Sequence, residues 1–561
     1  MKILDTRRTT GPSLFTSKSG AMLDVEVPDT RQEEVLQVWE KCVPYVLNVI
    51  GWRNEEMKSR RYPGGISLYF SAPIDALYSA CSINEVIWGL TFSVLNGGEL
   101  FLAPEKCTEL NNEIRDELNP PLLEMKKAAH EHQVRFLQSD DIVSIGTGTG
   151  SQQFEVDSIP TPDEIDWNQV SDVPVVLITG TNGKSTTVRL MEAILTTAGI
   201  QSGASSTDGI RIAKQTVKSG DYSGPEGARS ILRNTDVETA VLEIARGGML
   251  RRGLPVKHIQ AALITNVAED HLGEYGVQNL SDMVETKFII QHGLADDGVL
   301  VLNADDTEIM KFAKSVSREI CWFSLDNSNP AIAGHINTGG KACTLKNSQI
   351  VYYENGTATK LLSIQDIPAT MNGAAVHNIS NCLAAIALAK SLKIKKEPII
   401  NGLRNFGCSF ADNPGRTNLI QKNGYTILID FAHNPHGMNA LVTVVNNIPA
   451  KRKLLLIGQA GDRSNDDIAN LVKTAAQMNL DQVIIAEIKK YMRGRGPGEV
   501  PGIISNCFRE NGIKECSIQY ADDILGGIKK SIQFAEQDDL LVLLCLDQKE
   551  EAFQFIENEL N

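Results

Sequence analysis

A short glycine-containing segment, GTNGKS at residues 180–185, constrains the fold of this chain more than any other stretch. It follows a run of apolar residues at 173–178, which is typical of a buried strand. It precedes a stretch whose apolar residues recur with helical spacing, at Val188, Met191, Ile194, Leu195 and Ala198. A strand, a glycine-containing turn and a helix in this order predict an α/β fold.

The same segment predicts a phosphate-binding loop. In such a turn, successive backbone N–H groups and the N-terminus of the following helix point at polyphosphate oxygens. Lys184 adds a positive charge, and the Ser185 hydroxyl is expected to hold Mg²⁺. The strict Walker pattern has a glycine at the position of Ile178, so this is a shorter variant of the loop. The alternative, a chance hexapeptide in a surface loop, is disfavoured by the flanking strand and helix.

Strand signals recur along the chain, at 240–242, 261–265 and 299–302, and then, after Pro414, at 426–429, 454–457, 483–486 and 540–546. Strands of the buried type, separated by helical or loop segments, indicate mostly parallel sheets. At roughly 150 residues per domain, 561 residues correspond to three or four domains. We predict an α/β protein with an α+β head domain at 1–165, a central P-loop domain with a mostly parallel sheet at 166–414, and a Rossmann-like α/β domain at 415–561.

The first 165 residues contain no motif that indicates a chemistry. A second glycine-rich stretch, GTGTGS at 146–151, is interpreted as a linker or a hairpin turn, because it is followed by Pro160 and Pro162 and by no periodic helix. His130 and His132 are two residues apart and do not share a helix face, so we expect them on the surface.

Charge and composition exclude several classes of function. The chain has 54 Lys and Arg against 69 Asp and Glu, a net charge of −15, which argues against binding to nucleic acid or to an anionic membrane surface. No apolar run near either end approaches the roughly 20 residues of a membrane span, and the start does not resemble a signal peptide. The ten cysteines are scattered and are expected to be reduced thiols. We therefore expect a cytoplasmic protein.

Three residues beyond the loop are candidates for a metal site. Glu243 ends the strand predicted at 240–242, and His271 follows the strand at 261–265. Both therefore lie at carboxyl ends of strands, where α/β sheets bind ligands. Lys287 follows on a predicted helix. Taken alone, each has a simpler interpretation, as a charge at a helix start, a loop histidine and a solvated lysine.

Several segments together resemble the Mur ligases in their order and spacing: GTNGKS, Glu243 in LEIARGGMLRRGL, TNVAEDHLG, Lys287, HNISN, NPGRTN and DFAHNPHG. The same segments are similar to folylpolyglutamate synthetase. The motifs STDGI, ARGG, GDYSGP, NPGR and RGRGPGE make the Mur-ligase half of the cyanophycin synthetases the nearest resemblance, over about 172 to about 500. The start, MKILDTRRTTGP, looks weakly like the head of the same synthetases.

The resemblance implies an ATP-dependent amide ligase. It assigns ATP to the loop residues Gly180, Thr181, Asn182, Gly183, Lys184, Ser185 and Thr186, to Asn378 and Asn381 near adenine, and to Arg416 and Asp430 near phosphate and ribose. It assigns two Mg²⁺ ions to Ser185, Glu243, His271 and Lys287, the last as a carbamylated lysine. The residues expected to act in catalysis are Lys184, His271 and Lys287.

The implied reaction has two steps. A substrate carboxylate attacks the γ-phosphate to give ADP and an acyl phosphate, and an amine then attacks the acyl carbon and expels phosphate. Arg416 and Asp430 lie on a different domain from the loop, so the site is expected to assemble when the last domain closes, about a hinge near Pro414. Closure also protects the acyl phosphate from water.

Substrate contacts are predicted at Thr207, Asp208, Arg246, His433, Asn434 and Arg493. The segments 207–210 and 220–229 are expected to form the wall of the substrate site. Alternatively, both segments are simply glycine-rich turns. Arg493 and Arg495 are equally consistent with a carboxylate clamp and with solvated loop residues. Cyanophycin synthetases carry an ATP-grasp ligase between head and Mur half, and only about 156–172 separates the two here. One ligation per site is therefore expected, with an amino acid or a dipeptide such as β-aspartyl-arginine.

Two other functions are kept as alternatives. One is an ATP-hydrolysing switch or motor, against which Arg416, Asp430 and the DFAHNP segment argue. The other is a non-catalytic scaffold or polymer anchor, against which the intact loop and metal candidates argue. Expected partners are small-molecule or peptide carboxylates and amines, and the resemblance implies a homo-oligomer.

Overall fold

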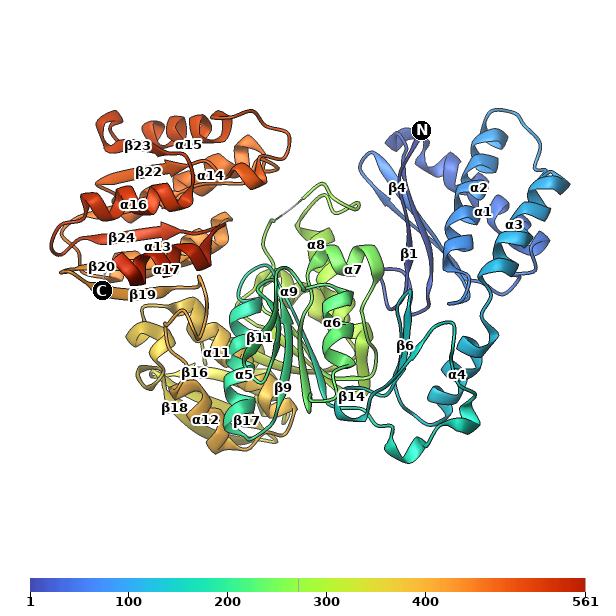
Figure 1. Cartoon of the computed structure of the whole chain (residues 1–561), viewed down its shortest axis with the longest axis horizontal. Helices are drawn as coiled ribbons and strands as arrows, with labels where there is room; N and C mark the ends of the chain where they lie inside the picture. The colour runs from blue at the N-terminus through green and yellow to red at the C-terminus, as the bar shows by residue number, and fades with distance from the viewer. Residues whose placement is uncertain (271, 560–561) are drawn as a thin grey trace.

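The computed structural model describes residues 1–270 and 272–559 of the chain (Figure 1). The head begins with an antiparallel sheet of order β1-β2-β4-β3. Its strands are β1 (Lys2–Thr9), β2 (Gly20–Glu26), β3 (Met57–Tyr62) and β4 (Gly65–Ser71). Alternate apolar residues of β2 and β4 pack against the helices α1 (Gln32–Val49) and α2 (Leu77–Leu95), where Trp39 and Ile83 are fully buried. The helices α3 (Pro104–Glu117) and α4 (Pro120–Glu131) follow.

A small antiparallel sheet joins the head to the rest of the chain. It consists of β5 (Phe136–Gln138), β6 (Ile142–Ile145) and β7 (Gln152–Glu155). The GTGTGS segment connects β6 to β7 and is therefore a hairpin turn, one of the two interpretations above. Gly148 has a φ of 57°, and a Cβ there would lie 2.3 Å from the Val237 carbonyl oxygen, so the turn packs directly on the central unit.

The central unit is built on a sheet of eleven strands, in the order β11-β10-β9-β12-β8-β13-β14-β15-β16-β17-β18. From β9 to β16 all neighbours are parallel, and the outer strands on both sides are antiparallel, which confirms the predicted mostly parallel sheet. The strands are β8 (Val175–Thr179), β9 (Ser202–Ser206), β10 (Gly209–Ile212), β11 (Gln215–Ser219), β12 (Thr239–Glu243), β13 (Ile259–Ile264), β14 (Leu294–Asn303), β15 (Glu319–Ser324), β16 (Lys341–Lys346), β17 (Gln349–Glu354) and β18 (Thr357–Ser363).

Helices cover both faces of this sheet, so its inner strands are apolar on both sides. In β8, Val176 and Ile178 face α5 (Lys184–Thr197), α11 (Val376–Ser391) and α12 (Lys396–Arg404). Val175 and Leu177 face the opposite layer, which contains α6 (Pro225–Leu232), α7 (Arg246–Arg252), α8 (Leu280–Phe288), α9 (Thr307–Phe312) and α10 (Pro330–Asn337).

The last unit is a second α/β sheet of order β19-β20-β24-β21-β22-β23, parallel except for β19. Its strands are β19 (Asn418–Lys422), β20 (Tyr425–Asp430), β21 (Lys453–Ile457), β22 (Gln482–Ala486), β23 (Ile518–Ala521) and β24 (Leu540–Leu544). One face packs on α13 (Pro435–Asn447), α14 (Asn465–Ala475) and α15 (Glu499–Glu510), the other on α16 (Ile524–Phe534) and α17 (Lys549–Glu559). The predicted strand at 540–546 is β24, which is completely buried inside this sheet.

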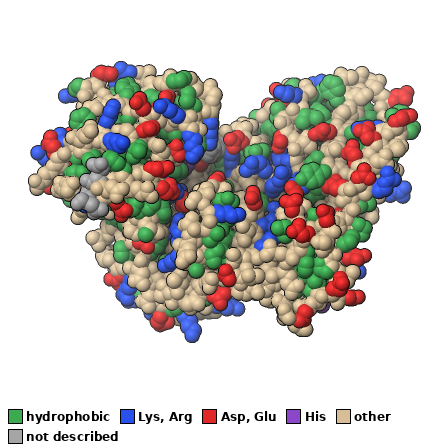
Figure 2. Space-filling view, viewed as in Figure 1, with side chains coloured by type: hydrophobic (Ala, Val, Ile, Leu, Met, Phe, Trp, Pro, Cys, Tyr) green, Lys and Arg blue, Asp and Glu red, His purple; other side chains and the backbone are tan. Residues whose placement is uncertain are grey.

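The head and the last unit stand on either side of the central sheet, with a hollow between them (Figures 1 and 2). Lys and Arg side chains gather in this hollow although the chain is acidic (Figure 2). Within residues 1–270 and 272–559, no helix is long and apolar enough to cross a membrane.

Candidate active site

The GTNGKS loop fills a narrow space between the end of β13 and helix α11. Gly180 has a φ of 147°, and a Cβ on it would lie 1.8 Å from Thr265 Oγ1. Gly183, at the N-cap of α5, has a φ of 86°, and its Cβ would lie 2.3 Å from Asn381 Oδ1. Both positions therefore require glycine, for conformation and for space.

The loop presents N–H groups at the start of α5. Thr187 N donates to Gly183 O at 2.9 Å, and in the described chain no earlier backbone N–H of this helix bonds to a loop carbonyl. These N–H groups are thus available to an anion at the positive end of the helix. The loop itself is held by Asn266, whose carbonyl oxygen accepts from Thr181 N and whose side-chain oxygen accepts from Asn182 N, both at 2.9 Å.

Ser185 and Glu243 form a compact oxygen pair beside the loop. Ser185 Oγ donates to Glu243 Oε2 at 2.8 Å and lies 3.1 Å from Thr207 Oγ1. Glu243 is completely buried at the end of β12, and its Oε1 has no hydrogen-bond partner among the described residues. Burial raises the pKa of Glu243, and the nearby charge of Lys184 opposes that shift. An orphaned carboxylate oxygen next to a hydroxyl fits the oxygen ligands that Mg²⁺ prefers.

Lys287, on α8, is the second lysine that lines the cleft. Its side chain is buried, and this burial lowers the pKa of the ammonium group to about 7, with a further lowering by Lys184. A large fraction of Lys287 is therefore an uncharged amine near neutral pH. His271, the third predicted catalytic residue, lies outside the described residues.

The last unit closes directly onto the loop. The side-chain amides of Asn182 and Asn434 bond to one another in both directions at 3.2 Å, and Asn182 Nδ2 also lies 2.9 Å from His436 Nδ1. Asn434 additionally caps α13 by accepting from Gly437 N at 2.8 Å. Asn434 thus holds the loop from behind and does not line the cleft, in contrast to its predicted role in substrate binding.

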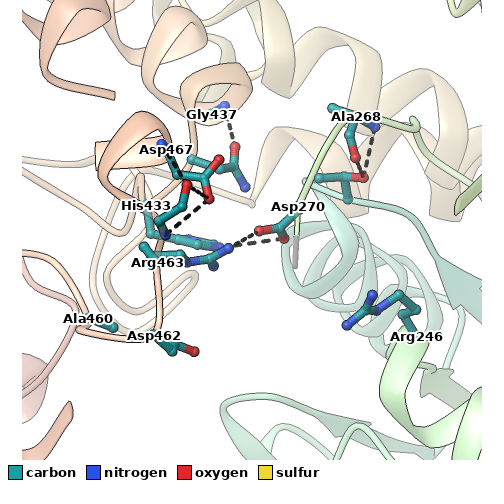
Figure 3. Close-up of polar contacts among 12 residues, drawn as sticks. Arg246, Ala268, Asp270, His433, Gly437, Ala460, Asp462, Arg463 and Asp467 are labelled. Atoms are coloured by element: carbon teal, nitrogen blue, oxygen red, sulfur yellow. Dashed lines mark hydrogen bonds and ion pairs between the residues drawn. The ribbon is translucent and has the colours of Figure 1, made fainter. Parts of the chain in front are cut away.

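A second contact across the cleft joins Asp270 to Arg463 (Figure 3). Arg463 Nη1 donates to Asp270 Oδ1 at 2.8 Å, and His433 Nε2 lies 4.0 Å from Asp270 Oδ2. His433 Nδ1 donates to Phe431 O at 3.0 Å, and burial lowers the pKa of this histidine to about 4 although Asp270 raises it. His433 is therefore a neutral group at the domain boundary.

Residues predicted for the nucleotide lie on the adjoining walls. Asn378 Nδ2 donates to Ala369 O at 2.9 Å, and Asn381 Nδ2 donates to Asn378 Oδ1 at 3.2 Å. The Arg416 guanidinium lies 4.2 Å from the centre of the Phe431 ring, and Asp430 Oδ2 accepts from Thr417 N at 2.8 Å. All these side chains except Ala369 line one cleft of about 1140 Å³ with the loop, Glu243 and Lys287.

The predicted substrate residues separate into two groups. Thr207, Arg246, His433 and Arg493 line the cleft. Asp208 does not line the cleft: only 6% of its side chain is exposed, and it pairs with Lys549 Nζ of α17 at 2.5 Å, which is an interdomain contact.

Arg493 and Arg495, for which the sequence allowed either a carboxylate clamp or a solvated position, differ in their contacts. Arg493 pairs with Asp462 and lies over the Tyr491 ring. The Arg495 guanidinium donates hydrogen bonds to the carbonyl oxygens of Gly461 and Arg463.

Sequence reasoning missed Asp270, Arg463, His436 and Lys549. Arg463 ends the segment QAGDR, which follows β21, so the rule that ligands gather at carboxyl ends of strands was a usable signal. Lys549 offered no comparable signal, because its partner is 341 residues away in the chain.

The site lies between two lobes. One lobe carries a variant phosphate loop on a mostly parallel sheet, and the other is a Rossmann-like sheet that closes over this loop. These features define a two-lobed nucleotide-binding protein. Residues 178–389 match the family model described as the Mur ligase middle domain, and residues 415–545 match the one described as the Mur ligase glutamate ligase domain. The chain therefore belongs to the Mur ligases.

Individual relatives agree with this assignment. The chain is 39% identical over 338 residues to cyanophycin synthetase of Geminocystis herdmanii, which covers 60% of this chain and 38% of that protein. It is 26% identical over 277 residues to UDP-N-acetylmuramate–L-alanine ligase of Clostridium acetobutylicum. This match covers 48% of this chain and 55% of that protein. It spans only about two fifths of the cyanophycin synthetases that it matches.

A solved structure shares the fold. Escherichia coli FolC in complex with DHPP and ADP superposes with a TM-score of 0.51 at 18% identity, over 69% of this chain and 89% of that one. At this identity the likeness concerns the fold alone.

Proposed function

We propose that the protein is an ATP-dependent amide ligase, which joins a substrate carboxylate to the amine of an amino acid or dipeptide with formation of ADP. One observation carries the proposal: a buried carboxylate with an orphaned oxygen, Glu243, lies against the Ser185 hydroxyl at the end of the phosphate loop, inside a cleft closed by the last unit. Membership of the Mur ligases and the similarity to proteins named as ligases support it.

The residues of the chain divide the chemistry between them. The N–H groups at the start of α5 and the Lys184 ammonium bind the β- and γ-phosphates of ATP and stabilise the negative charge that develops during transfer. Ser185 and Glu243 would hold Mg²⁺, with His271 as a further ligand, and bound Mg²⁺ would neutralise phosphate charge. The carboxylate then receives the phosphoryl group, and the amine displaces phosphate from the acyl carbon.

Lys287 is proposed to carry a carbamate that helps to hold the second Mg²⁺. Carbamylation requires a neutral amine to attack CO₂, and burial keeps much of Lys287 neutral near pH 7. The product is an anion, which suits a position beside a cation better than an ammonium group does. Asp270 and Arg463 join the two lobes over this part of the cleft.

The test is an assay of product and nucleotide together. The protein is incubated with Mg²⁺, ATP and a panel of amino acids and β-aspartyl dipeptides, and mass spectrometry is used to find an adduct equal to two substrates minus one water. We expect one ADP per adduct, and ADP formation only when both a carboxylate and an amine are present. Steady ADP formation without adduct would instead support the ATP-hydrolysing switch.

The matched variants are Lys184→Ala and the exposed Lys346→Ala. Loss of the Lys184 charge is expected to reduce ADP formation by at least about a hundredfold, because one donor to the transition-state charge contributes roughly 3 kcal/mol. Lys346→Ala is expected to retain the wild-type rate. Equal rates in the two variants would contradict the assignment of the phosphate site.

A further inference from the structure

A second cavity of about 1100 Å³ lies between the head and the central unit. It is lined by β1 and the β5–β6 hairpin on one side and by α6 and α7 on the other. Pro225, Glu226, Gly248 and Arg251 line both this cavity and the active-site cleft, so the two adjoin one another. An elongated molecule that reaches past these four residues would have one end at the phosphate loop and the other in the second cavity.

Several arginines of this cavity have no acidic partner among the described residues. Arg229, Arg251 and Arg252 have no carboxylate oxygen within 4.0 Å in the described part of the chain. Two other arginines of the cavity are paired: Arg7 with Asp5 and Asp24 at 2.7 and 2.5 Å, and Arg8 with both oxygens of Asp140 at 2.7 and 2.9 Å. In a chain with an excess of 15 acidic residues, a group of unpaired arginines in one hollow is unexpected.

The acidic side chains of the cavity do not neutralise this group. Glu117 is bound to the N–H groups of Tyr78 and Ser79, and Asp75 accepts from Asn119 N at 3.1 Å. Asp141, Asp157 and Glu226 are exposed at the rim. Among the residues that the structure describes, Asp140 is the carboxylate that pairs with a member of this group, and its partner is Arg8.

Arg229 and Arg252 also have unused hydrogen-bonding capacity. Arg229 Nη2 donates to Thr10 Oγ1 at 3.0 Å, whereas its buried Nε has no partner among the described residues. Arg252 Nη1 donates to the Arg8 carbonyl oxygen at 3.2 Å. Burial lowers the pKa of both guanidinium groups, and each is also lowered by the charge of Arg8. An unsatisfied buried donor in a repulsive cationic cluster is costly unless an anion binds there.

We propose that Arg229 and Arg252, with Arg8, bind a distal anionic group of the carboxylate substrate, while its reacting carboxylate lies in the active-site cleft. This inference rests on the proposed function and adds a substrate class, namely an elongated acid with a carboxylate or phosphate far from the reacting end. Arginine suits both anions because its planar fork donates two parallel hydrogen bonds. The head is then part of the substrate site.

The test measures binding and does not depend on turnover. Isothermal titration calorimetry is performed on the full chain saturated with Mg²⁺ and ADP, so that the phosphate loop is filled. The probes are tetraglutamate, tetraglutamine and inorganic tripolyphosphate. We expect one or both anions to bind and tetraglutamine not to bind. The anion that binds identifies a carboxylate or a phosphate as the distal group.

Three variants complete the design. Arg229→Gln and Arg252→Gln are each expected to weaken anion binding at least tenfold, and Arg229→Lys is expected to restore only part of it, because lysine keeps the charge without the fork. The control Arg115→Gln removes an exposed charge from the same head and is expected to bind like wild type. Circular dichroism and melting temperature establish that each variant is folded.

The inference is overturned if neither anion binds, if tetraglutamine binds as tightly as tetraglutamate, or if both glutamine variants retain wild-type affinity. These outcomes are separate from a failure of the proposed function. A protein that binds the anion but never forms an adduct contradicts only the ligase activity, and one that forms adducts without binding the anion contradicts only this site.

Discussion

Gly180 occupies a position where a side chain has no room. Its φ of 147° is unfavourable for other residue types, and a Cβ would lie 1.8 Å from Thr265 Oγ1. We expect Gly180→Ala to displace the loop, to abolish detectable ATP binding in calorimetry and to lower stability by about 2 kcal/mol. Gly502→Ala is the control, because this helical glycine has open space around its Cβ position and should be neutral or slightly stabilising. Normal ATP binding by Gly180→Ala would contradict the loop geometry.

His433 links stability to pH. Burial lowers its pKa to about 4 in the folded state, so between pH 4 and about 6.5 the unfolded chain binds a proton that the folded chain does not. Its contribution to stability is complete above pH 6.5 and is lost as the pH falls toward 4. We expect the melting temperature to fall less between pH 7 and pH 5 in His433→Asn than in wild type, by roughly 2 °C. Identical pH profiles would show that His433 is not held in its neutral form.

At the scale of elements, α17 is attached to the turn between β9 and β10. Lys549 of α17 pairs with the buried Asp208 at 2.5 Å, and Thr207, next in the chain, contacts Ser185. Nearby, the Phe410 and Phe553 rings stack with their centres 4.1 Å apart. Helix α17 therefore helps to position the side of the loop that carries Ser185.

Removal of this pair is expected to weaken both stability and nucleotide binding. Lys549→Met leaves Asp208 buried without its lysine, and we expect a loss of about 3 kcal/mol, together with a several-fold higher KM for ATP. The double variant Asp208→Asn with Lys549→Met should recover part of the stability, which a double-mutant cycle measures. The exposed Lys473→Met is the control. Additive effects of the two substitutions would exclude a direct interaction.

At the scale of the whole molecule, Arg135 connects the head to the central unit. Its guanidinium donates to the carbonyl oxygens of Lys257, Val173 and His258 at 3.0, 2.8 and 2.6 Å, and the residue is 6% exposed. We expect Arg135→Met to leave these acceptors unsatisfied and to separate the unfolding of the head from that of the central unit. Calorimetry should show a lower, broader or split transition, while the half-exposed Arg31→Met should match wild type. A single unchanged transition would indicate that the head and the central unit unfold together without the contacts of Arg135.

Local patterns in the sequence determined a large part of the fold of this protein. The phosphate loop, the mostly parallel central sheet and the strand β24 followed from residues within about twenty positions of one another, because strand and helix periodicity and the glycine turn are local properties. The roles assigned to single site residues from the family resemblance stay predictions, as do the domain limits at 165 and 414.

Only the tertiary structure decided which distant side chains meet. Asp270 with Arg463, Asn182 with Asn434, and Asp208 with Lys549 are each separated by more than 190 residues, and burial and charge complementarity at the domain boundary select these pairs. No periodicity encodes such contacts, which is why Asp208 was expected at a substrate and lies instead beneath the cleft wall. The cationic cavity between head and central unit has the same origin, because its arginines come from β1, α6 and α7 and gather only after the three elements pack together.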